Sequence, residues 1–206
     1  MVLFDEIEKA HPRLLDKFLQ VLEDGRLTDG RGETVYFSES ILVFTSNLGI
    51  YVTDAAGNRV QSVSHKDDYV TVESRVRTAI SNHFKFQLGR PEILNRIGDN
   101  IVVFNFIRPE VAGRILDGML ANVRRRVMDE HKLDMAISPH AQAQLQELCT
   151  MDLTNGGRGI GNRLETVFIN PLARALFLQA PEGAGVATVE ALSVDDNVYS
   201  VQLRLG

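Results

Sequence analysis

A short apolar run that ends in two adjacent carboxylates is the sequence feature that most constrains this chain. Val2, Leu3 and Phe4 lead directly into Asp5 and Glu6. An apolar run of this length, bounded by polar residues, is typical of a buried strand. Such a strand would bring both acids to one edge of a sheet, where one carboxylate can position a hydrated metal ion and the other a nucleophilic water. The alternative is an ordinary strand that ends in two solvated acids.

The composition indicates a globular chain and excludes several classes of function. The 206 residues are enough for one large domain or two small ones. A net charge of −5 gives no electrostatic argument for nucleic acid or for an anionic membrane surface as a partner. The single cysteine, Cys149, allows no internal disulfide, so we expect a reducing, cytoplasmic location. The sequence shows neither an apolar run long enough to span a membrane nor a signal peptide.

A second apolar run with a polar tip occupies residues 41–47 and predicts a second buried strand. Two such strands joined through a helix favour a parallel sheet, in which sites lie at the carboxyl ends of the strands. Asn47 is therefore expected near Asp5 and Glu6, where its amide can orient a water or a phosphate oxygen. The alternative for Asn47 is a turn-forming residue before Leu48.

Periodicity and turn chemistry predict the remaining elements up to residue 106. In order, they are a helix over 12–24, a hairpin over 25–37, a mobile surface insertion over 50–69, a helix over 70–86, a short helix that opens at 89–92 and carries Arg96, and a third buried strand over 101–106.

The sequence after Arg108 predicts a smaller, more helical region that begins at Pro109. Its expected elements are a long helix from 109, a strand over 133–137, a helix from 138 to about 149, a glycine-rich entry at 156–159 to another helix, a loop over 181–185, and a hairpin of strands 187–194 and 198–205. Pro171 lies inside the helix after the glycines and is expected to bend it. The arginine run 124–126 either contacts nucleic acid or forms a solvated helix face, and the acidic balance of the chain favours the solvated face.

Five polar residues taken together suit the hydrolysis of a nucleoside triphosphate. They are Asp5, Glu6, Asn47, Arg96 and Arg158. Charge that develops on a γ-phosphoryl group is stabilised by a metal ion, an oriented water and guanidinium groups. The alternatives are a structural ion pair for Arg96 and an ordinary surface arginine for Arg158.

Six short segments resemble one known family and occur in a fixed order. They are spread along most of the chain, and the likeness extends over nearly all of it. They are residues 2–12 (VLFDEIEKAHP), 19–30 (LQVLEDGRLTDG), 45–49 (TSNLG), 90–97 (RPEILNRI), 156–158 (GGR) and 170–173 (NPLA). These segments resemble the C-terminal part of the second ATPase module of Clp-type AAA+ chaperones, and most of all the protein-disaggregating heat-shock members. The first resembles the Walker B region, the third sensor 1, the fourth the arginine-finger segment and the fifth sensor 2.

The resemblance implies an α/β fold in two parts. Residues 1–107 would form the C-terminal portion of the large ATPase subdomain, an incomplete AAA+ parallel sheet with flanking helices. Residues 108–206 would form the small α+β lid domain. It also implies ATP and Mg²⁺ as cofactors, protein substrates, and a hexameric ring.

The resemblance further implies a role for each residue of the set. Asp5 would hold Mg²⁺ through its water shell, and Glu6 would activate the attacking water. Asn47 would orient that water or sense the γ-phosphate. Arg158 would reach the phosphates from the small domain of the same subunit. Arg96 would act in trans on the nucleotide of the neighbouring subunit.

Several features depart from the family pattern. These 206 residues contain no phosphate-binding loop of the Gly-x-x-x-x-Gly-Lys-Ser/Thr type and no substrate-gripping pore loop. Met1 lies where a strand is already under way, so we expect the chain to start inside a larger domain and to be inactive alone. Gly157 and Gly159 replace residues typical of sensor 2, which loosens the expected aim of Arg158. Gly98 stands where an acid often follows the finger segment.

Three functional hypotheses remain open from the sequence. The first is part of an ATP-driven unfoldase or disaggregase that threads proteins through a ring. The second is a non-catalytic assembly or regulatory module that packs on full-length rings. The third is a hydrolytic metal site of Asp5, Glu6 and His11, which lacks further ligands at suitable spacing. The sequence identifies neither the client proteins nor a co-chaperone or peptidase partner.

Overall fold

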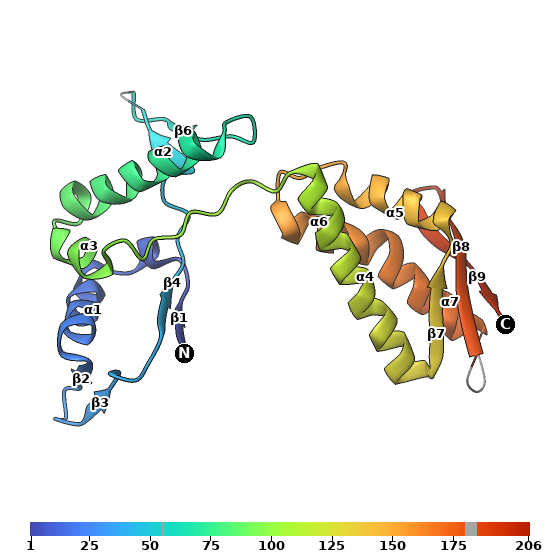
Figure 1. Ribbon diagram of the computed structural model, residues 1–206, viewed down its shortest axis with the longest axis horizontal. Helices are drawn as coiled ribbons and strands as arrows, with labels where there is room; N and C mark the ends of the chain where they lie inside the picture. Colours follow the sequence, from blue (N-terminus) through green and yellow to red (C-terminus); the bar gives the residue numbers. More distant parts are fainter. Residues whose placement is uncertain (55, 180–184) are drawn as a thin grey trace. The chain divides into compact units, whose positions relative to one another are not determined.

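The computed structural model describes residues 1–54, 56–179 and 185–206. These residues form two compact units, Met1–Asn105 and Phe106–Gly206, hereafter the first and second units. Each unit combines helices with small sheets (Figure 1), which confirms the mixed α/β class. Among the helices of the described residues, none has both the length and the apolar character needed to cross a bilayer.

The first unit contains six short strands and three α-helices within its described residues. In order they are β1 (Val2–Phe4), η1 (Ile7–Lys9), α1 (Pro12–Asp24), β2 (Arg26–Thr28), β3 (Thr34–Tyr36), β4 (Leu42–Phe44), β5 (Tyr51–Thr53), β6 (Arg59–Gln61), α2 (Tyr69–Asn82), the π-helical turn η2 (His83–Gln87) and α3 (Pro91–Ile97). The helix predicted over 12–24 and the hairpin that follows it are confirmed, because Gly25 ends α1 with a φ of 63° and β2 pairs antiparallel with β3.

The strands β1 and β4 pair in parallel, with Phe4 opposite Phe44, as the two apolar runs predict. Phe18 of α1 packs against both rings, with centroid distances of 4.6 Å to Phe4 and 5.5 Å to Phe44. Leu3 points to the opposite face of the sheet, because side chains alternate along a strand, and it is 57% exposed. The prediction of fully buried strands is therefore wrong: α1 covers one face, and the residues described leave much of the other open.

Two further predictions for the first unit need correction. Residues 101–106 form no strand, and Val102 and Phe104 are 74% and 88% exposed, because no described strand pairs with this segment. The described residues of the insertion over 50–69 are mostly exposed, with Val63 buried, and they contain an antiparallel hairpin, β5 and β6, that the mixed polar sequence did not reveal.

Gly49 fixes how the chain leaves the β4 side of the sheet. Its φ is +87°, and a Cβ at this position would lie 2.8 Å from the Cα of Val76 in α2. A contact this short leaves no room for any side chain, so glycine lets the loop after β4 pack directly against α2.

The second unit forms a three-stranded sheet covered by helices. Its elements are α4 (Pro109–His131), β7 (Leu133–Ile137), α5 (Pro139–Thr150), α6 (Gly156–Leu164), η3 (Glu165–Ile169), α7 (Asn170–Gln179), β8 (Gly185–Asp195) and β9 (Val198–Leu205). β7 pairs in parallel with β8, and β8 pairs antiparallel with β9. The predicted hairpin is confirmed, with Asp196 and Asn197 both at positive φ in its turn. The loop predicted over 181–185 falls, apart from Gly185, outside the described residues.

Pro171 produces a local change of helix type. Immediately before it, η3 is a π-helical turn, in which the N–H of Asn170 donates to the carbonyl of Glu165. Such a turn inserts one extra residue, so that Pro171 becomes the second residue of α7, where its missing N–H costs little. The structure thus accommodates Pro171 through a π-turn, and the predicted bend of the helix stays a prediction.

Candidate functional site

The site residues of the first unit lie where β1 and β4 end. The parallel register continues past the strands, since Thr45 N–H donates to the Phe4 carbonyl at 3.0 Å and Ile7 N–H to the Thr45 carbonyl at 3.0 Å. Asp5 and Glu6 therefore leave β1 beside the segment of residues 45–47 that leaves β4 (Figure 1). The structure brings Asp5, Glu6 and Asn47 to one edge of this sheet.

Thr45 connects the two strand ends directly. Its hydroxyl donates a hydrogen bond to Asp5 Oδ1 and accepts one from the Glu6 backbone N–H, at 3.2 Å. The sequence did not single out Thr45. The available signal was its position, since it follows β4 as Asp5 follows β1.

Glu6 has an unusual backbone conformation. Its φ and ψ are 54° and 53°, in the left-handed region that non-glycine residues rarely adopt, at a cost of roughly 1–3 kcal/mol. Hydrogen bonds hold this conformation on both sides, from Glu6 N–H to Thr45 and from Lys9 N–H to the Glu6 carbonyl. The Glu6 carboxylate also pairs with Lys9 Nζ at 2.7 Å. The hydrogen bond that Lys9 donates to Glu6, together with the negative charge of Glu6 and the neighbouring acids, raises the pKa of Lys9.

Asn47 is held through its backbone while its side chain stays available. Its N–H donates to Glu8 Oε1 at 3.2 Å. The other carboxylate oxygen, Glu8 Oε2, is buried and has no hydrogen-bond partner among the described residues. Within the same residues the Asn47 side-chain amide makes no hydrogen bond, and Asn47 is exposed. The amide is thus free to contact a bound water or phosphate oxygen.

Arg96 lies on α3 and is paired with α1. Its Nη2 and Nε lie 3.0 and 3.2 Å from Glu23 Oε1. Arg90, just before α3, pairs with Asp16 at 2.7 Å, and this hydrogen bond raises the pKa of Arg90 and lowers that of Asp16. Arg96 therefore forms an ion pair within the chain, as the structural alternative predicted. To act on the nucleotide of a neighbouring subunit, Arg96 would have to release Glu23.

Arg158 lies in the first turn of α6 in the second unit. It is exposed and makes no hydrogen bond or ion pair within the described part of the chain. That Gly157 and Gly159 loosen the helix entry stays a prediction, although the local geometry explains two of the glycines around Arg158. Gly156 has a φ of +57°, and a Cβ on Gly159 would lie 3.0 Å from Asn155 Cβ. Gly156 therefore suits a positive φ that other residues rarely adopt, and Gly159 suits the short distance to Asn155.

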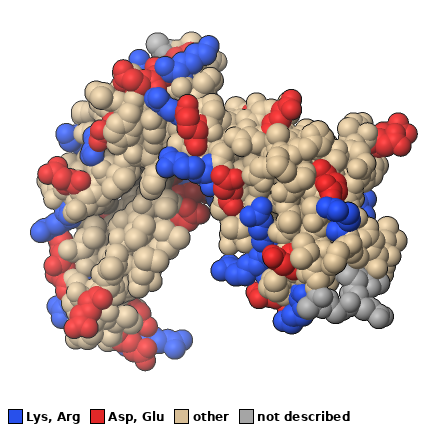
Figure 2. Space-filling view, turned by 45° about the vertical axis from the view of Figure 1, so that its right-hand side comes forward, with Lys and Arg blue, Asp and Glu red and all other residues tan. Residues whose placement is uncertain are grey.

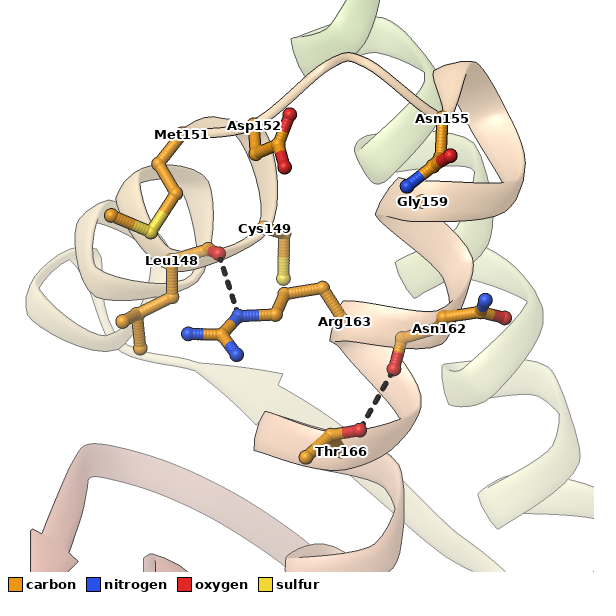
Figure 3. Close-up of a pocket in the computed structure, with 9 residues that line it drawn as sticks. All are labelled: Leu148, Cys149, Met151, Asp152, Asn155, Gly159, Asn162, Arg163 and Thr166. Carbon is orange, nitrogen blue, oxygen red and sulfur yellow. Dashed lines mark hydrogen bonds between the residues drawn. The ribbon is translucent and has the colours of Figure 1, made fainter. Parts of the chain in front are cut away.

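A cavity of about 400 Å³ lies in the second unit (Figure 3), and none of the five predicted site residues is among the residues that line it. It is bordered by the end of α5, the loop that follows and α6, and Arg163 extends across it (Figure 3). The Arg163 guanidinium donates to the Leu148 carbonyl at 3.3 Å and to the Tyr199 hydroxyl at 3.2 Å. Burial raises the pKa of the adjacent Cys149 thiol to about 11, although Arg163 opposes the shift, so the thiol is unreactive near neutral pH. These contacts indicate a structural role for Arg163.

The described residues contain no group of three or more His, Cys, Asp or Glu arranged to hold a metal ion. His11 is the N-cap of α1, where its Nδ1 accepts the Arg13 N–H at 3.2 Å. Mg²⁺ in nucleotide sites is commonly held by one or two carboxylates together with waters and phosphates. Asp5, exposed and oriented by Thr45, fits that limited role, whereas a metal centre made by protein ligands alone does not fit.

Comparison with known proteins identifies a family and several similar sequences. The sequence profile of the AAA domain (Cdc48 subfamily) matches residues 1–101. The chaperone protein ClpB of Rhizobium meliloti is 35% identical over 190 residues, which cover 92% of this chain and 20% of the relative. Chaperone protein ClpB 1 of Thermosynechococcus vestitus is 34% identical over 177 residues, 85% of this chain and 19% of the relative. Heat shock protein 100 of Trypanosoma brucei brucei is 42% identical over 127 residues, 62% of this chain and 13% of the relative.

The chain belongs to the AAA+ family. Its relatives extend over most of its length and identify it, within that family, as part of a Clp-type chaperone module. The chain spans about a fifth of the length of the ClpB relatives that it matches.

Proposed function

We propose that this chain supplies the catalytic strand ends and the small domain of an ATP-driven protein unfoldase or disaggregase. The longer protein would couple ATP hydrolysis to the remodelling of protein substrates, as a hexameric ring in the cytoplasm. Neither nucleic acid nor a membrane would be a partner, and charged side chains of both signs are interspersed on the face shown in Figure 2. Residues 1–107 would belong to the large ATPase subdomain and residues 108–206 to the small one, and the compact units divided at residue 105 support this assignment.

The observation that carries the proposal is the convergence of Asp5, Glu6 and Asn47 at the parallel strand ends, with Glu6 held in a strained conformation. Strained backbone persists where surrounding contacts fix it, and such residues cluster at functional sites. Mg²⁺ bound with ATP would stabilise the charge of the transferring phosphoryl group. Asp5 would contact the water shell of that ion, Glu6 would accept the proton of the attacking water, and Asn47 would orient that water.

The two arginines would complete the site from outside this strand edge. Arg158 would bind the phosphates held by its own subunit, which its exposed and unpaired guanidinium supports. Arg96 would act on the nucleotide of the neighbouring subunit after release from Glu23. An exposed ion pair of this kind is worth about 0–1 kcal/mol, so a phosphate can readily compete for the guanidinium.

The 206 residues alone should neither bind ATP tightly nor hydrolyse it, because they contain no phosphate-binding loop. The second candidate function is a non-catalytic module that packs on full-length rings. The continuous core of the second unit favours it, since a unit with its own core can act as an assembly element.

A chimera tests the proposal. Residues 1–206 replace the matching segment of the Rhizobium meliloti ClpB relative. ATP turnover is measured with any other ATPase module of the relative inactivated, and recovery of heat-aggregated protein with it intact. We expect turnover in the chimera, at least about a hundredfold less in the Glu6→Gln chimera, and none in the isolated chain. An assembled but inactive chimera, or robust turnover by the isolated chain, would contradict the proposal.

A further inference from the structure

We propose that Thr45 and Glu8 are positioning residues that form a reciprocal clamp between the ends of β1 and β4. Thr45, which follows β4, orients Asp5 and Glu6, which follow β1. Glu8, on the β1 side, orients Asn47 on the β4 side. The inference rests on the proposed function, because it assigns these two residues the task of fixing the distance between the acids and the amide.

The Thr45 half of the clamp uses both hydrogen-bonding capacities of one hydroxyl. A hydroxyl offers one donor and two acceptor lone pairs. The donor is directed to Asp5 Oδ1, and one lone pair accepts the Glu6 N–H at 3.2 Å. The same side chain therefore fixes the rotamer of one acid and the backbone of the next. Asp5 Oδ2 has no hydrogen-bond partner among the described residues, so it remains available to a hydrated ion.

The backbone of Thr45 reinforces its side chain. Its N–H donates to the Phe4 carbonyl, and its carbonyl accepts the Ile7 N–H, both at 3.0 Å. Thr45 is thus anchored to residues on either side of the acid pair. This anchoring gives the hydroxyl a fixed position from which to hold Glu6 in its left-handed conformation, which few L-residues adopt unaided.

The Glu8 half runs in the opposite direction across the sheet edge. Glu8 Oε1 accepts the Asn47 N–H at 3.2 Å, and Oε2 is buried without a partner. A carboxylate oxygen removed from water without a hydrogen bond is unfavourable, so simple solvation does not explain the orientation of this side chain. Lys9, the adjacent cation, pairs with Glu6 and not with Glu8 among the described contacts. Among the described residues, the side-chain hydrogen bond of Glu8 is the one that it accepts from the Asn47 N–H.

Together, the contacts of Thr45 and Glu8 fix the end of β1 and the end of β4 relative to each other. Phosphoryl transfer depends mainly on positioning, and displacement of a reacting group by about 1 Å can cost on the order of a hundredfold in rate. Loss of either half should therefore affect the rate of hydrolysis more than the affinity for nucleotide.

The first test uses the 206-residue chain and measures amide hydrogen exchange by NMR at Glu6 and Asn47. Thr45→Val removes the hydroxyl at nearly constant volume, and we expect exchange at Glu6 to accelerate by about tenfold or more. Thr45→Ser keeps the hydroxyl and should retain most of the protection. Glu8→Ala should accelerate exchange at Asn47, whereas Glu8→Gln keeps an acceptor oxygen and should not.

Lys9→Met is the matched control, because it removes the charge partner of Glu6 without touching either clamp bond. Unchanged amides in α1 and α2, which belong to the same unit and lie outside the clamp, would report that each variant is folded.

The second test places the same substitutions in the ClpB chimera. We expect Thr45→Val and Glu8→Ala to lower kcat for ATP by about tenfold or more with KM changed less than about threefold, and Thr45→Ser and Glu8→Gln to restore most of kcat. Unchanged exchange at Glu6 and Asn47 in the first test would overturn the clamp. Altered exchange with unchanged kcat would overturn its positioning role. An unsubstituted chimera that assembles without turnover counts against the proposed function alone, and the exchange results then decide whether the clamp exists.

Discussion

The two units of this chain bury their apolar residues in very different ways. In the second unit, every helix and every strand contributes to one hydrophobic cluster around Phe168, which is fully buried. The first unit has a small cluster of Leu15, Phe84 and Ile93 with partly buried neighbours. Its strands form three separate two-stranded sheets. Leu3, Ile41 and Phe104 remain more than half exposed.

The two units therefore differ in how far contacts within the described residues stabilise their folds. A parallel sheet normally needs cover on both faces, and an isolated two-stranded sheet is marginally stable. The sheet of the second unit contributes buried residues to a core within that unit, whereas the strand ends that carry Asp5, Glu6 and Asn47 belong to a sheet that does not. Both outer edges of the β1–β4 pair lack a strand partner among the residues described, which also makes this unit the expected site of self-association.

The largest expected effect is a difference in local stability between the units. Amide hydrogen exchange of the whole chain should give protection in β7 and β8 that exceeds that in β1 and β4 by at least about 3 kcal/mol. Equal protection in both sheets would show that the two units unfold together and would break the comparison.

Phe168→Ala should lower the free energy of unfolding of the second unit by about 3–5 kcal/mol, because the ring is 0% exposed in the centre of its core. Phe177→Ala is the matched control, since this ring is 84% exposed, and it should change stability by less than about 0.5 kcal/mol. Denaturant unfolding followed by NMR of each unit measures both. Similar losses in the two variants would show that the cluster around Phe168 is not the stabilising core.

Gly49→Ala should destabilise the first unit by roughly 2–5 kcal/mol, because the new Cβ meets the Val76 Cα at 2.8 Å and the φ of +87° is unfavourable for alanine. Gly57→Ala separates these two causes. Gly57 has nearly the same φ, +86°, and no atom of the described residues lies within 4 Å of the added atom, so the substitution should cost only the conformational part, about 1–2 kcal/mol. Equal effects would mean that the close approach of the loop to α2 is unimportant.

Cys149 should make the second unit lose stability in alkali. Its pKa is raised from 9.0 to about 11, so between these values the unfolded thiol ionises while the folded thiol stays protonated. The unfolded state then binds fewer protons, and the free energy of unfolding should fall by roughly 2–3 kcal/mol as pH rises through this window. Cys149→Ala should show a correspondingly shallower pH dependence, and parallel curves for the two proteins would contradict the prediction.

The smallest effect is expected at the ion pair between α3 and α1. Glu23→Gln should change the stability of the first unit by less than about 1 kcal/mol, because Arg96 and Glu23 are both about half exposed. Thermal unfolding gives the measurement. A loss well above that value would assign Arg96 a structural role and weaken its proposed action on a neighbouring nucleotide.

The sequence by itself determined the elements whose ends are set by local chemistry. Pro12 and Gly25 delimit α1, Ser138 caps α5 through the Ala141 N–H, and Asp196 with Asn197 forms the last hairpin turn. Each of these signals acts within a few residues, so no distant partner is needed to interpret it. The same holds for the two apolar runs that predicted the parallel pair β1 and β4 and the common edge of Asp5 and Asn47.

The tertiary structure alone decided the features that depend on distant partners. Thr45 and Asp5 are 40 positions apart, and Glu8 and Asn47 are 39 apart, so no periodic pattern links them. The open face of the β1–β4 pair and the absence of a strand at 101–106 depend in the same way on which other segments lie beside them. Local chemistry thus named the acids and the amide of the candidate site, whereas contacts across the sheet edge determined how they are held.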